Sequence, residues 1–502
     1  MKVTNPKLTL YAFHLRNNLA QGEEKPVNDA NHLWEQCQRL GQKLNIPQLQ
    51  SLLESLQDSN GNIGMVPSKD NPKSDYLELL PQRSLDFSAI PDGSTLQLRG
   101  EVYPLQIHDT YAVDITLRYP YPHVEIEQLA DLNPQGCLRI TQSKSLLGQT
   151  LVLFVQPEDE IQDIQAFANE CLAAILASER QQYLLSTQGK FLGSPIFEYE
   201  NIQETTDQPS HILIWLNCNN QTETLEEAGD YYQPLINLLC CRSKILYTYA
   251  ESRWCNQQAR VLYRQLEDKV QGFRQLPSDP DEKLKQLEGW LTEIPKTAFG
   301  YANYLRDLEI YRIAIEINCK NYKSCLKHLE TSSIDGENNL EIWQKFINQV
   351  QEKIIKQINF DLSYLLPSKP FFQQMIDAVR GIVEKEQAQS DRAAESTAQK
   401  RQQRLELLIT VASTGLALSG ISSQVANEPA KTILTQLFPA QFRESSKPES
   451  LSYLVTSFSP VVFHLLVGVI FAIPLGGIVW GIQTDLIGKI RRFIKKLANR
   501  HP

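Results

Sequence analysis

Two uncharged apolar stretches near the end of the chain, at residues 407–426 and 461–482, limit its possible folds more than any other feature. Each is about 20 residues long, and a helix of that length crosses a hydrocarbon layer of about 30 Å. Pro474 is expected to kink the second stretch, and Trp480 suits the membrane interface. The sequence therefore predicts a transmembrane hairpin over residues 405–485, with a buried hairpin in a soluble core as the alternative.

The charges beside these stretches indicate an orientation. Lys400, Arg401 and Arg404 precede the first stretch, whereas the cations of the connecting loop are balanced by acids. The second stretch is followed by Lys489, Arg491, Arg492, Lys495, Lys496 and Arg500. Because positive charge collects on the cytosolic side of a membrane, we predict a cell-membrane protein with two spans and both termini in the cytoplasm.

The tail over residues 486–502 interleaves those last cations with Ile490, Phe493, Ile494 and Leu497. This pattern is typical of a basic amphipathic helix on anionic headgroups, so the six cations are predicted membrane-surface residues and the lipid bilayer a predicted partner. A nucleic-acid-binding tail is the alternative. The net charge of −9 argues against bulk nucleic-acid binding by the whole chain, and no specific nucleic-acid partner is predicted.

The chain before residue 220 carries strand and helix patterns in alternation. Of its 502 residues, 42% are hydrophobic, which is enough for several cores. Strands are predicted at residues 8–15, 95–103, 111–119, 151–155, 194–200 and 211–218, and helices at 28–57, interrupted at Pro47, and from Pro157 onward. We therefore predict an α+β cytosolic domain over residues 1–220.

Residues 221–367 are predicted to be almost entirely helical, with a long helix over 224–275 and a capped restart at 278–282. Two apolar stripes follow at heptad-like spacing, formed by Tyr301, Leu305, Leu308, Ile315, Tyr322, Leu326 and Leu329, and then by Trp343, Ile347, Val350, Ile354, Ile358, Leu362 and Leu365. The pattern predicts an elongated antiparallel bundle. The stripes serve either packing within the chain or oligomerisation.

The stretch over residues 368–404 opens with Ser368 and Pro370 and then contains Gly381 as its only glycine and no further proline. Its second half is polar all round, so it cannot build a core alone. We predict a stalk helix that continues into the first span.

The first span is only moderately apolar. Ser422 and Ser423 lie three and four residues after Ser419 and share one helical face with it, and Gln424 follows them. Such side chains are expected to face neighbouring helices or a pore rather than lipid. Ser419, Ser422, Ser423 and Gln424 are therefore the predicted pore-lining residues.

This layout resembles the CorA-type two-span metal transporters, most strongly over residues 370–500. The resemblance implies a cytosolic α/β domain, a stalk that leads into the first span, and a pentamer with the first spans around a pore. The family ends its first span with Gly-Met-Asn, but residues 420–424 read Gly-Ile-Ser-Ser-Gln, so magnesium selectivity is not implied. Divergent CorA-like proteins also act as membrane effectors of bacterial defence systems.

Sequence motifs of catalysis are missing from the chain. It has no phosphate-binding glycine loop, no His-Glu-x-x-His and no Gly-x-Ser-x-Gly. Its nine cysteines lack a disulfide or metal spacing and are expected to be buried, reduced thiols. We predict no enzyme activity, no catalytic residue, no metal site and no cofactor.

Three polar groups remain as weaker candidates. His108 and Asp109 are adjacent, and a second group consists of His123, Glu125, Glu127 and Asp131. The first three of these alternate, which on a strand would place them on one face, where they could hold a cation. Arg118, Tyr119, Tyr121 and His123 include aromatic rings on which a ligand could stack. A solvated strand face or an ordinary exposed edge is the better interpretation of these groups.

Together these features predict a membrane-anchored homo-oligomer with a large cytosolic sensor or effector region. It would form a CorA-like ion-conducting channel or serve as a membrane effector of a defence system. The competing interpretation is a non-conducting scaffold whose α/β domain binds a cytosolic protein or a small-molecule ligand at the membrane.

Overall fold

The computed structural model describes residues 1–17, 19, 26–58, 63, 76–90, 97–120, 123–176, 183–201, 211–331 and 338–391. The predicted transmembrane hairpin, the end of the stalk, the pore-lining side chains and the basic tail lie outside these residues, so they stay predictions. Among the helices that are described, none is long and apolar enough to span a membrane.

The chain divides into two compact units. Among the described residues, unit 1 comprises those within 1–254 and 310–360, and unit 2 comprises those within 255–309 and 361–391. The predicted N-terminal α/β domain and long helices are both present. The two longest of the described helices are α6 (Tyr232–Gly272, 41 residues) and α7 (Pro280–Thr331, 52 residues), and both contribute residues to both units.

Unit 1 is built on one ten-stranded mixed sheet. Its main path runs β2-β4-β5-β1-β7-β10-β9-β8, while β3 pairs with β4 and β6 pairs with β1. The strands are β1 (Lys2–Leu15), β2 (Tyr76–Glu78), β3 (Leu85–Ala89), β4 (Leu98–Ile107), β5 (Thr110–Arg118), β6 (His123–Glu125), β7 (Leu146–Pro157), β8 (Tyr183–Phe191), β9 (Ser194–Asn201) and β10 (His211–Leu216). All pairs are antiparallel except β7 with β10, so these two central strands need a crossover connection.

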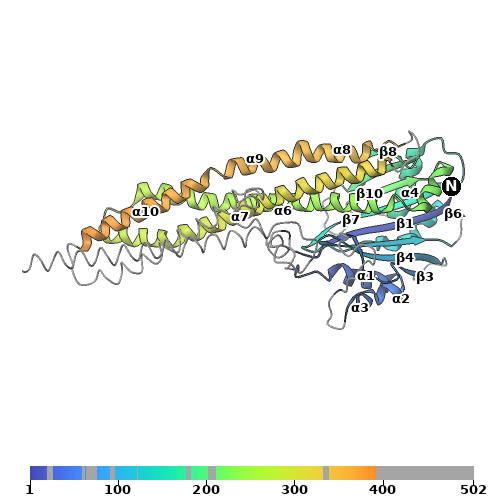
Figure 1. The fold of residues 1–502 in the computed structure, drawn as a ribbon, viewed down its shortest axis with the longest axis horizontal. Coiled ribbons are helices and arrows are strands. Elements are labelled where there is room, and N and C mark those ends of the chain that lie inside the picture. The colour runs from blue at the N-terminus through green and yellow to red at the C-terminus, as the bar shows by residue number, and fades with distance from the viewer. Residues whose placement is uncertain are drawn as a thin grey trace, which may run out of the picture. The chain divides into compact units, whose positions relative to one another are not determined.

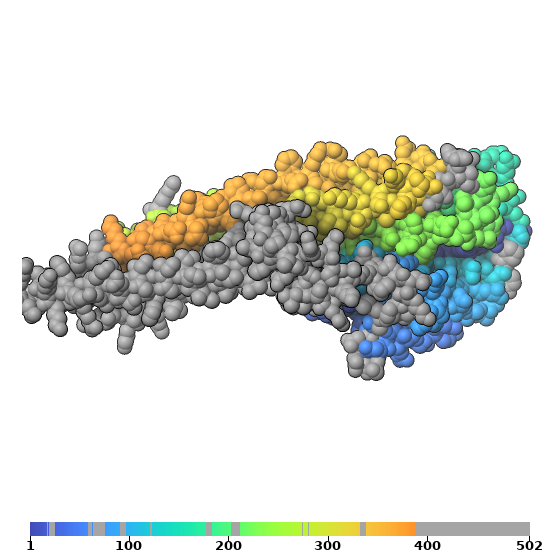
Figure 2. All heavy atoms as spheres, in the orientation of Figure 1, coloured from blue at the N-terminus to red at the C-terminus, as the bar shows by residue number. Residues whose placement is uncertain are grey.

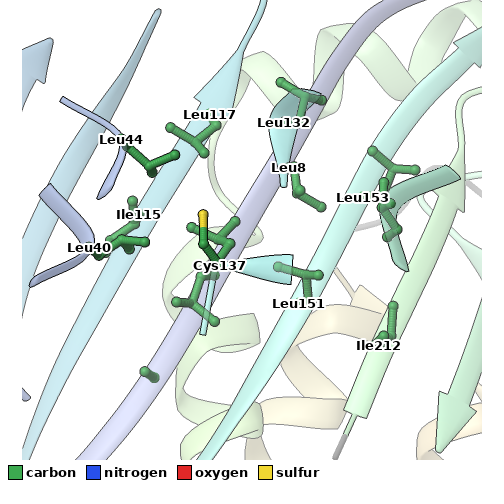
Figure 3. Packing of buried hydrophobic residues seen from close by; sticks show 14 of the residues in the cluster. Leu8, Leu40, Leu44, Ile115, Leu117, Leu132, Cys137, Leu151, Leu153 and Ile212 are labelled. Carbon is green, nitrogen blue, oxygen red and sulfur yellow. The ribbon is translucent and has the colours of Figure 1, made fainter. Parts of the chain in front are cut away.

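One face of the sheet packs on a mainly apolar core. Leu8, Leu151, Leu153 and Ile212 project from neighbouring strands into this core, and Cys137 lies among them (Figure 3). The helices α1 (His32–Lys43) and α4 (Ile164–Leu176) cover this face with their buried side chains, as do the short α2 (Pro47–Gln50), α3 (Leu52–Leu56) and η1 (Ile126–Leu132). The short η2 (Pro134–Gly136) follows η1 and buries no residue.

The opposite face is covered by helices that come later in the chain. These are the first part of α6, the second part of α7, and α8 (Glu341–Gln349), which lies on the other side of the sheet from α1 to α3 (Figure 1). Figure 2 shows these helical residues, in green to yellow, packed directly against the strand residues in blue to cyan. Unit 1 therefore has three layers, helix, sheet and helix.

Several predicted boundaries move in the structure. The helix predicted from Pro157 begins instead at Ile164, because Pro157 still pairs with Val3 in the sheet and Asp163 Oδ1 accepts the N–H of Ala166 as a helix cap. The helix predicted over 28–57 is three helices. The helix predicted over 224–275 begins earlier, as α5 (Asn220–Ala228), and breaks at Gly229, whose φ of +76° ends α5 in the left-handed conformation before α6 starts.

The two predicted apolar stripes are buried within the single chain. All seven residues of the first stripe are at most 4% exposed, and in the second stripe all but Ile354 are buried. The second stripe runs along α8, a π-helical turn η5 (Val350–Ile355) and α9 (Lys356–Leu365). Packing within the chain therefore accounts for the stripes without a second copy.

Unit 2 is helical, with parts of α6 and α7, the short η4 (Phe273–Gln275), the end of α9, and α10 (Ser368–Asp391). The hydroxyl of Tyr301 donates to the carbonyl of Leu365 at 2.6 Å. Lys283 Nζ lies 2.6 Å from Glu386 Oε1, which ties the start of α7 to α10. α10 starts where the sequence predicts the stalk to start.

Candidate functional site

Helix α6 meets the sheet through polar and charged groups as well as through buried apolar residues such as Ile236 and Leu239. We call this layer the polar seam and define it by the α6 residues Tyr232, Arg242, Ser243 and Lys244 and the sheet residues Asp109, Asp114, Gly148, Thr150, Glu198, Glu200 and His211. All of these groups belong to unit 1.

Three consecutive residues of α6 contact three different parts of the sheet. Arg242 reaches β9, where its Nη2 donates to Glu200 Oε1 at 2.6 Å. Lys244 reaches in the other direction and pairs with Asp109 in the turn between β4 and β5. Successive helical residues differ by about 100°, so two residues that are two positions apart project to opposite sides of the helix.

Ser243, between these two cations, lies directly over β7. A Cβ atom added to Gly148 would lie 3.1 Å from the hydroxyl oxygen of Ser243 and 3.3 Å from its Cβ. Gly148 therefore permits the close approach of α6 to the middle of the sheet. Arg242, Ser243 and Lys244 together hold α6 across the sheet from β9 through β7 to the β4–β5 turn.

Arg242 occupies a nearly enclosed site. It is 5% exposed, its guanidinium lies 5.0 Å from the ring centroid of Phe346 on α8, and its Nη2 is 3.8 Å from Glu198 Oε1. Glu198 is buried, whereas the side chain of Glu200 is 48% exposed. The Nε atom of Arg242 is buried without a hydrogen-bond partner. The cation is thus held by one buried carboxylate, one half-exposed carboxylate and an aromatic face.

A chain of three hydrogen-bonded groups continues from Glu198 across the sheet. Glu198 Oε1 lies 2.7 Å from His211 Nε2, and His211 Nδ1 lies 2.9 Å from the hydroxyl of Thr150. An ionised Glu198 accepts only, so Nε2 carries the proton and Nδ1 accepts from Thr150. A hydroxyl bonded to an imidazole that is bonded to a carboxylate is the arrangement found in catalytic triads. There the hydroxyl is the nucleophile, the imidazole the general base and the carboxylate the group that orients the imidazole.

The surroundings of this chain shift its two acid–base groups in the same direction. Burial acts to raise the pKa of Glu198, but the hydrogen bond from His211 and the charges of His211 and Arg242 outweigh it and lower that pKa. Burial and the positive charge of Arg242 lower the pKa of His211. At neutral pH Glu198 is therefore ionised and His211 is neutral.

Access decides what this chain can do chemically. Thr150 is 2% exposed and His211 is 1% exposed, and α6 closes over both. A substrate reaches Thr150 only if α6 leaves the sheet. In the arrangement observed, the three groups fix the position of α6 rather than attack a bound molecule.

A second polar cluster lies where α6 begins. The hydroxyl of Tyr232 donates to Asp114 Oδ2 at 2.8 Å, and the hydroxyl of Thr116 donates to Asp114 Oδ1 at 3.0 Å. Thr9 on β1 is in turn 2.8 Å from Thr116. Asp114 is 6% exposed, and burial raises its pKa to about 7. Tyr232 is also packed between the rings of Tyr11 and Tyr103, with centroids 6.4 and 6.0 Å away.

The structure places the weaker sequence candidates apart from each other. Asp109 enters the polar seam, whereas the neighbouring His108 is exposed in a turn with a φ of +53°. His123 and Glu125 are exposed on the same side of β6, as their alternation predicts, but Glu127 lies in η1. His123 Nδ1 is 3.6 Å from Glu158. Within the described residues no group of acids, histidines and cysteines is arranged to hold a metal ion.

The aromatic candidate group is also divided. Tyr119 is buried and donates its hydroxyl to the carbonyl of Gln128, so its polar end is not available to a ligand. Tyr121 lies outside the described residues, as do the predicted pore-lining residues Ser419, Ser422, Ser423 and Gln424 and the predicted membrane-surface residues Lys489, Arg491, Arg492, Lys495, Lys496 and Arg500.

The sequence did carry a signal for the polar seam. Asp114 interrupts an apolar run on β5, and Arg242 and Lys244 stand in a helical stretch whose other residues are mainly apolar. Charged side chains at positions that the local period predicts to be buried are rare unless paired. The signal identifies the residues, but their partners across α6 and the sheet are 42 to 135 residues away in the sequence and follow only from the sheet order.

The chain matches no family model, and no curated protein or solved structure is significantly similar to it.

Proposed function

We propose that this protein is a membrane-anchored, oligomeric sensor or effector in which α6 is the output element of the α/β domain. The observation that carries the proposal is the polar seam, in which ionisable groups hold α6 on the sheet. In this proposal a cytosolic protein or a small-molecule ligand changes how α6 is held, and the helical region passes that change to the membrane.

The chemistry of the seam supports a switching role more than a purely stabilising one. Desolvating two charges costs about as much as their attraction returns, so a buried ion pair adds little stability over an apolar pair of the same shape. A hydrogen-bonded polar layer does define discrete arrangements, because each buried group must keep a partner. An element held in this way has a small number of alternative positions that a ligand can select.

The membrane part of the proposal comes from the amino-acid sequence. It relies on the two apolar stretches at 407–426 and 461–482 and on the cations on their outer flanks. The serines of the first stretch support a conduit along its axis, in keeping with the resemblance to CorA-type transporters. These hydroxyls offer no charged ring, so selectivity between cations and anions would be weak.

The first experiment tests the anchor. Ile470 is at the centre of the second stretch, where an arginine costs about 2.5–3.5 kcal/mol of insertion free energy. The full-length wild type and an Ile470→Leu control are expected to stay in the membrane pellet after alkaline extraction, and Ile470→Arg is expected to be released in part. Wild-type protein that is extracted completely would refute the anchor.

The second experiment separates a conduit from a scaffold. Ser419→Cys and Ser423→Cys are compared with the parent chain, whose own cysteines supply the background, and with Leu466→Cys in the second stretch. A conduit predicts that a membrane-impermeant thiol reagent modifies positions 419 and 423 above background but leaves position 466 protected. Protection of all three positions would refute the conduit and leave a non-conducting anchored scaffold.

A further inference from the structure

A cleft opens at one end of unit 1, where the start of β1 meets the segment that leads from β7 to α4 (Figure 1). It has a volume of about 240 Å³ and lies at the carboxyl end of β7, which pairs in parallel with β10. In open α/β sheets, ligands are commonly bound beyond the carboxyl ends of the parallel strands. None of the residues that define the polar seam lines this cleft, so it is a separate place for a ligand.

The floor of the cleft is apolar. Pro157, Ile161 and Phe167 are the least exposed of its lining residues. Phe167 is 3% exposed and belongs to the apolar core, and Ile161 packs against that core. The core therefore holds this floor in place without a ligand. Such a surface accepts an apolar side chain or the aliphatic stem of a lysine or arginine.

The rim of the cleft is acidic. The chain over residues 158–170 contains five acids and no Lys, Arg or His, and Lys2 is the one cation that lines the cleft. Four of these acids are exposed lining residues, namely Asp159, Glu160, Asp163 and Glu170. None of the four forms an ion pair with another residue in the described part of the chain. Their negative charge is therefore available to a partner.

The distribution of these charges selects a class of ligand. Negative charge disfavours nucleic acids and anionic lipid headgroups, because both carry phosphates. The rim acids are not arranged to hold a metal ion, and neither is any other group of the described residues. Their charges are spread around an apolar floor. A chain with several cations on either side of an apolar side chain complements both features.

We propose that this cleft binds a basic segment of a partner protein, with lysine or arginine side chains on the acidic rim and one apolar side chain on the floor. The rim speeds and orients the encounter, and the apolar contact on the floor fixes which segment binds. The inference names the cytosolic protein partner of the proposed function, and it rests on that function for the role of the complex.

Two peptides test the proposal on the wild-type chain. The fluorescence anisotropy of a labelled Arg-Arg-Leu-Arg-Arg peptide is followed as full-length protein in a nonionic detergent is added. The control ligand is the same peptide with glycine in place of leucine. We expect saturable binding of the leucine peptide that weakens as salt is added, and a Kd for the glycine peptide that is larger by about fivefold or more.

Either of two results with these peptides would overturn the proposal. If the leucine peptide shows no saturable binding, the cleft does not take a basic segment. If both peptides bind with the same Kd, the floor accepts no apolar side chain, and the acids attract small polyvalent cations only.

A pair of tryptophan variants tests whether the peptide occupies the cleft. Ala166 is an exposed lining residue in the first turn of α4. Ala166→Trp fills the cleft without changing a charge and should raise the Kd of the leucine peptide by more than about tenfold. Ala378→Trp, at an exposed alanine of α10, is the matched control and should leave the Kd unchanged. An unchanged Kd in Ala166→Trp would overturn the proposal.

A pair of charge variants tests the rim. Asp159→Asn combined with Glu160→Gln should raise the Kd by about two- to thirtyfold. Asp281→Asn combined with Glu282→Gln removes the same two charges from exposed positions in α7 and should have little effect. Equal effects of the two pairs would show that the peptide responds to net charge alone and would overturn the proposal. Peptide binding requires neither a movement of α6 nor membrane insertion, so this proposal and the proposed function fail separately.

Discussion

The two faces of the sheet in unit 1 both bury apolar side chains, but the face under α6 also buries a set of charged and hydrogen-bonding groups. One face presents Leu8, Leu151, Leu153 and Ile212 to α1 and α4 and contains no charged group in its core. The other presents Asp114, Thr150, Glu198 and His211 to α6. Alternation along each strand separates the two sets, since neighbouring residues point to opposite faces.

This difference indicates two roles: apolar packing stabilises the domain, whereas the polar contacts set the position of α6. Apolar packing is non-directional and insensitive to pH, so α4 is expected to stay in place under all conditions in which the domain is folded. At the start of α1 the same face also holds a titratable group, the buried His14, whose ring lies 5.8 Å from that of His32. Hydrogen bonds and ion pairs are directional and respond to protons and ligands. The face under α6 is therefore the one on which a signal can act.

The largest effect is expected from removing one charge of the polar seam. Arg242→Leu leaves Glu198 buried without its cation, which should cost about 3–5 kcal/mol of the local opening free energy measured by hydrogen exchange in β9 and β10. Replacing Arg242, Glu198 and His211 together with apolar residues of similar volume should cost much less, because no buried charge is left unpaired. Equal costs for the single and the triple variant would contradict this account of the seam.

A comparable effect is expected on the apolar face. Leu153 is fully buried, and Leu153→Ala should reduce the free energy of unfolding by about 2–5 kcal/mol through lost burial and a cavity. Leu184→Ala, at a leucine that is 59% exposed, is the matched control and should cost little. The cost of Leu153→Ala should be the same at pH 5 and pH 8.5, and a strong pH dependence would erase the contrast between the two faces.

An intermediate effect is expected where α6 approaches the sheet most closely. Gly148→Ala places a methyl group against Ser243, and the resulting displacement should cost about 1–3 kcal/mol. Adding Ser243→Ala removes the hydroxyl that the methyl group meets and should recover part of that cost in thermal unfolding. If Gly148→Ala has no effect, α6 is not held at this point.

The smallest effect is expected at the edge of the polar seam. Glu200 is half-exposed, so Glu200→Gln should reduce stability by only about 0.2–1 kcal/mol, and added salt should diminish even that. Glu198→Gln, in the buried carboxylate two residues away, provides the comparison and should cost several times more. Equal losses in the two variants would show that burial does not distinguish these two acids.

Much of the fold follows from residue periodicity alone. Strands β5, β7, β9 and β10 lie where alternating or continuous apolar runs predict them, because their side chains have to fill a core on at least one face. β8 was missed because its exposures follow no clean alternation, and it lies at the edge of the sheet. The start of α4 was misplaced because the acids before it are also compatible with an extended chain.

The candidate site was less predictable, and the reason is one of connectivity. Arg242 and Lys244 are conspicuous in sequence as charges in a buried helical stretch, but nothing local indicates that Glu200 and Asp109 are their partners. That pairing depends on a sheet order in which β5 and β9 lie on either side of β1, β7 and β10. Sheet order is a long-range property that a single sequence does not specify.

The π-helical turn at Val350–Ile355 determines where the sequence of this chain tolerates the deletion of one residue. The stripe positions Val350, Ile354, Ile358 and Leu362 are each four residues apart, which in a regular α-helix would carry the stripe steadily around the axis. A π turn holds one more residue than an α turn, and so it absorbs part of that drift. The helix could therefore lose one residue here, returning to regular α-helix, while α8 and α9 keep their present contacts. A one-residue insertion or deletion inside a helix usually disrupts its packing. At this turn we expect a one-residue deletion to leave the packing of the flanking helices unchanged.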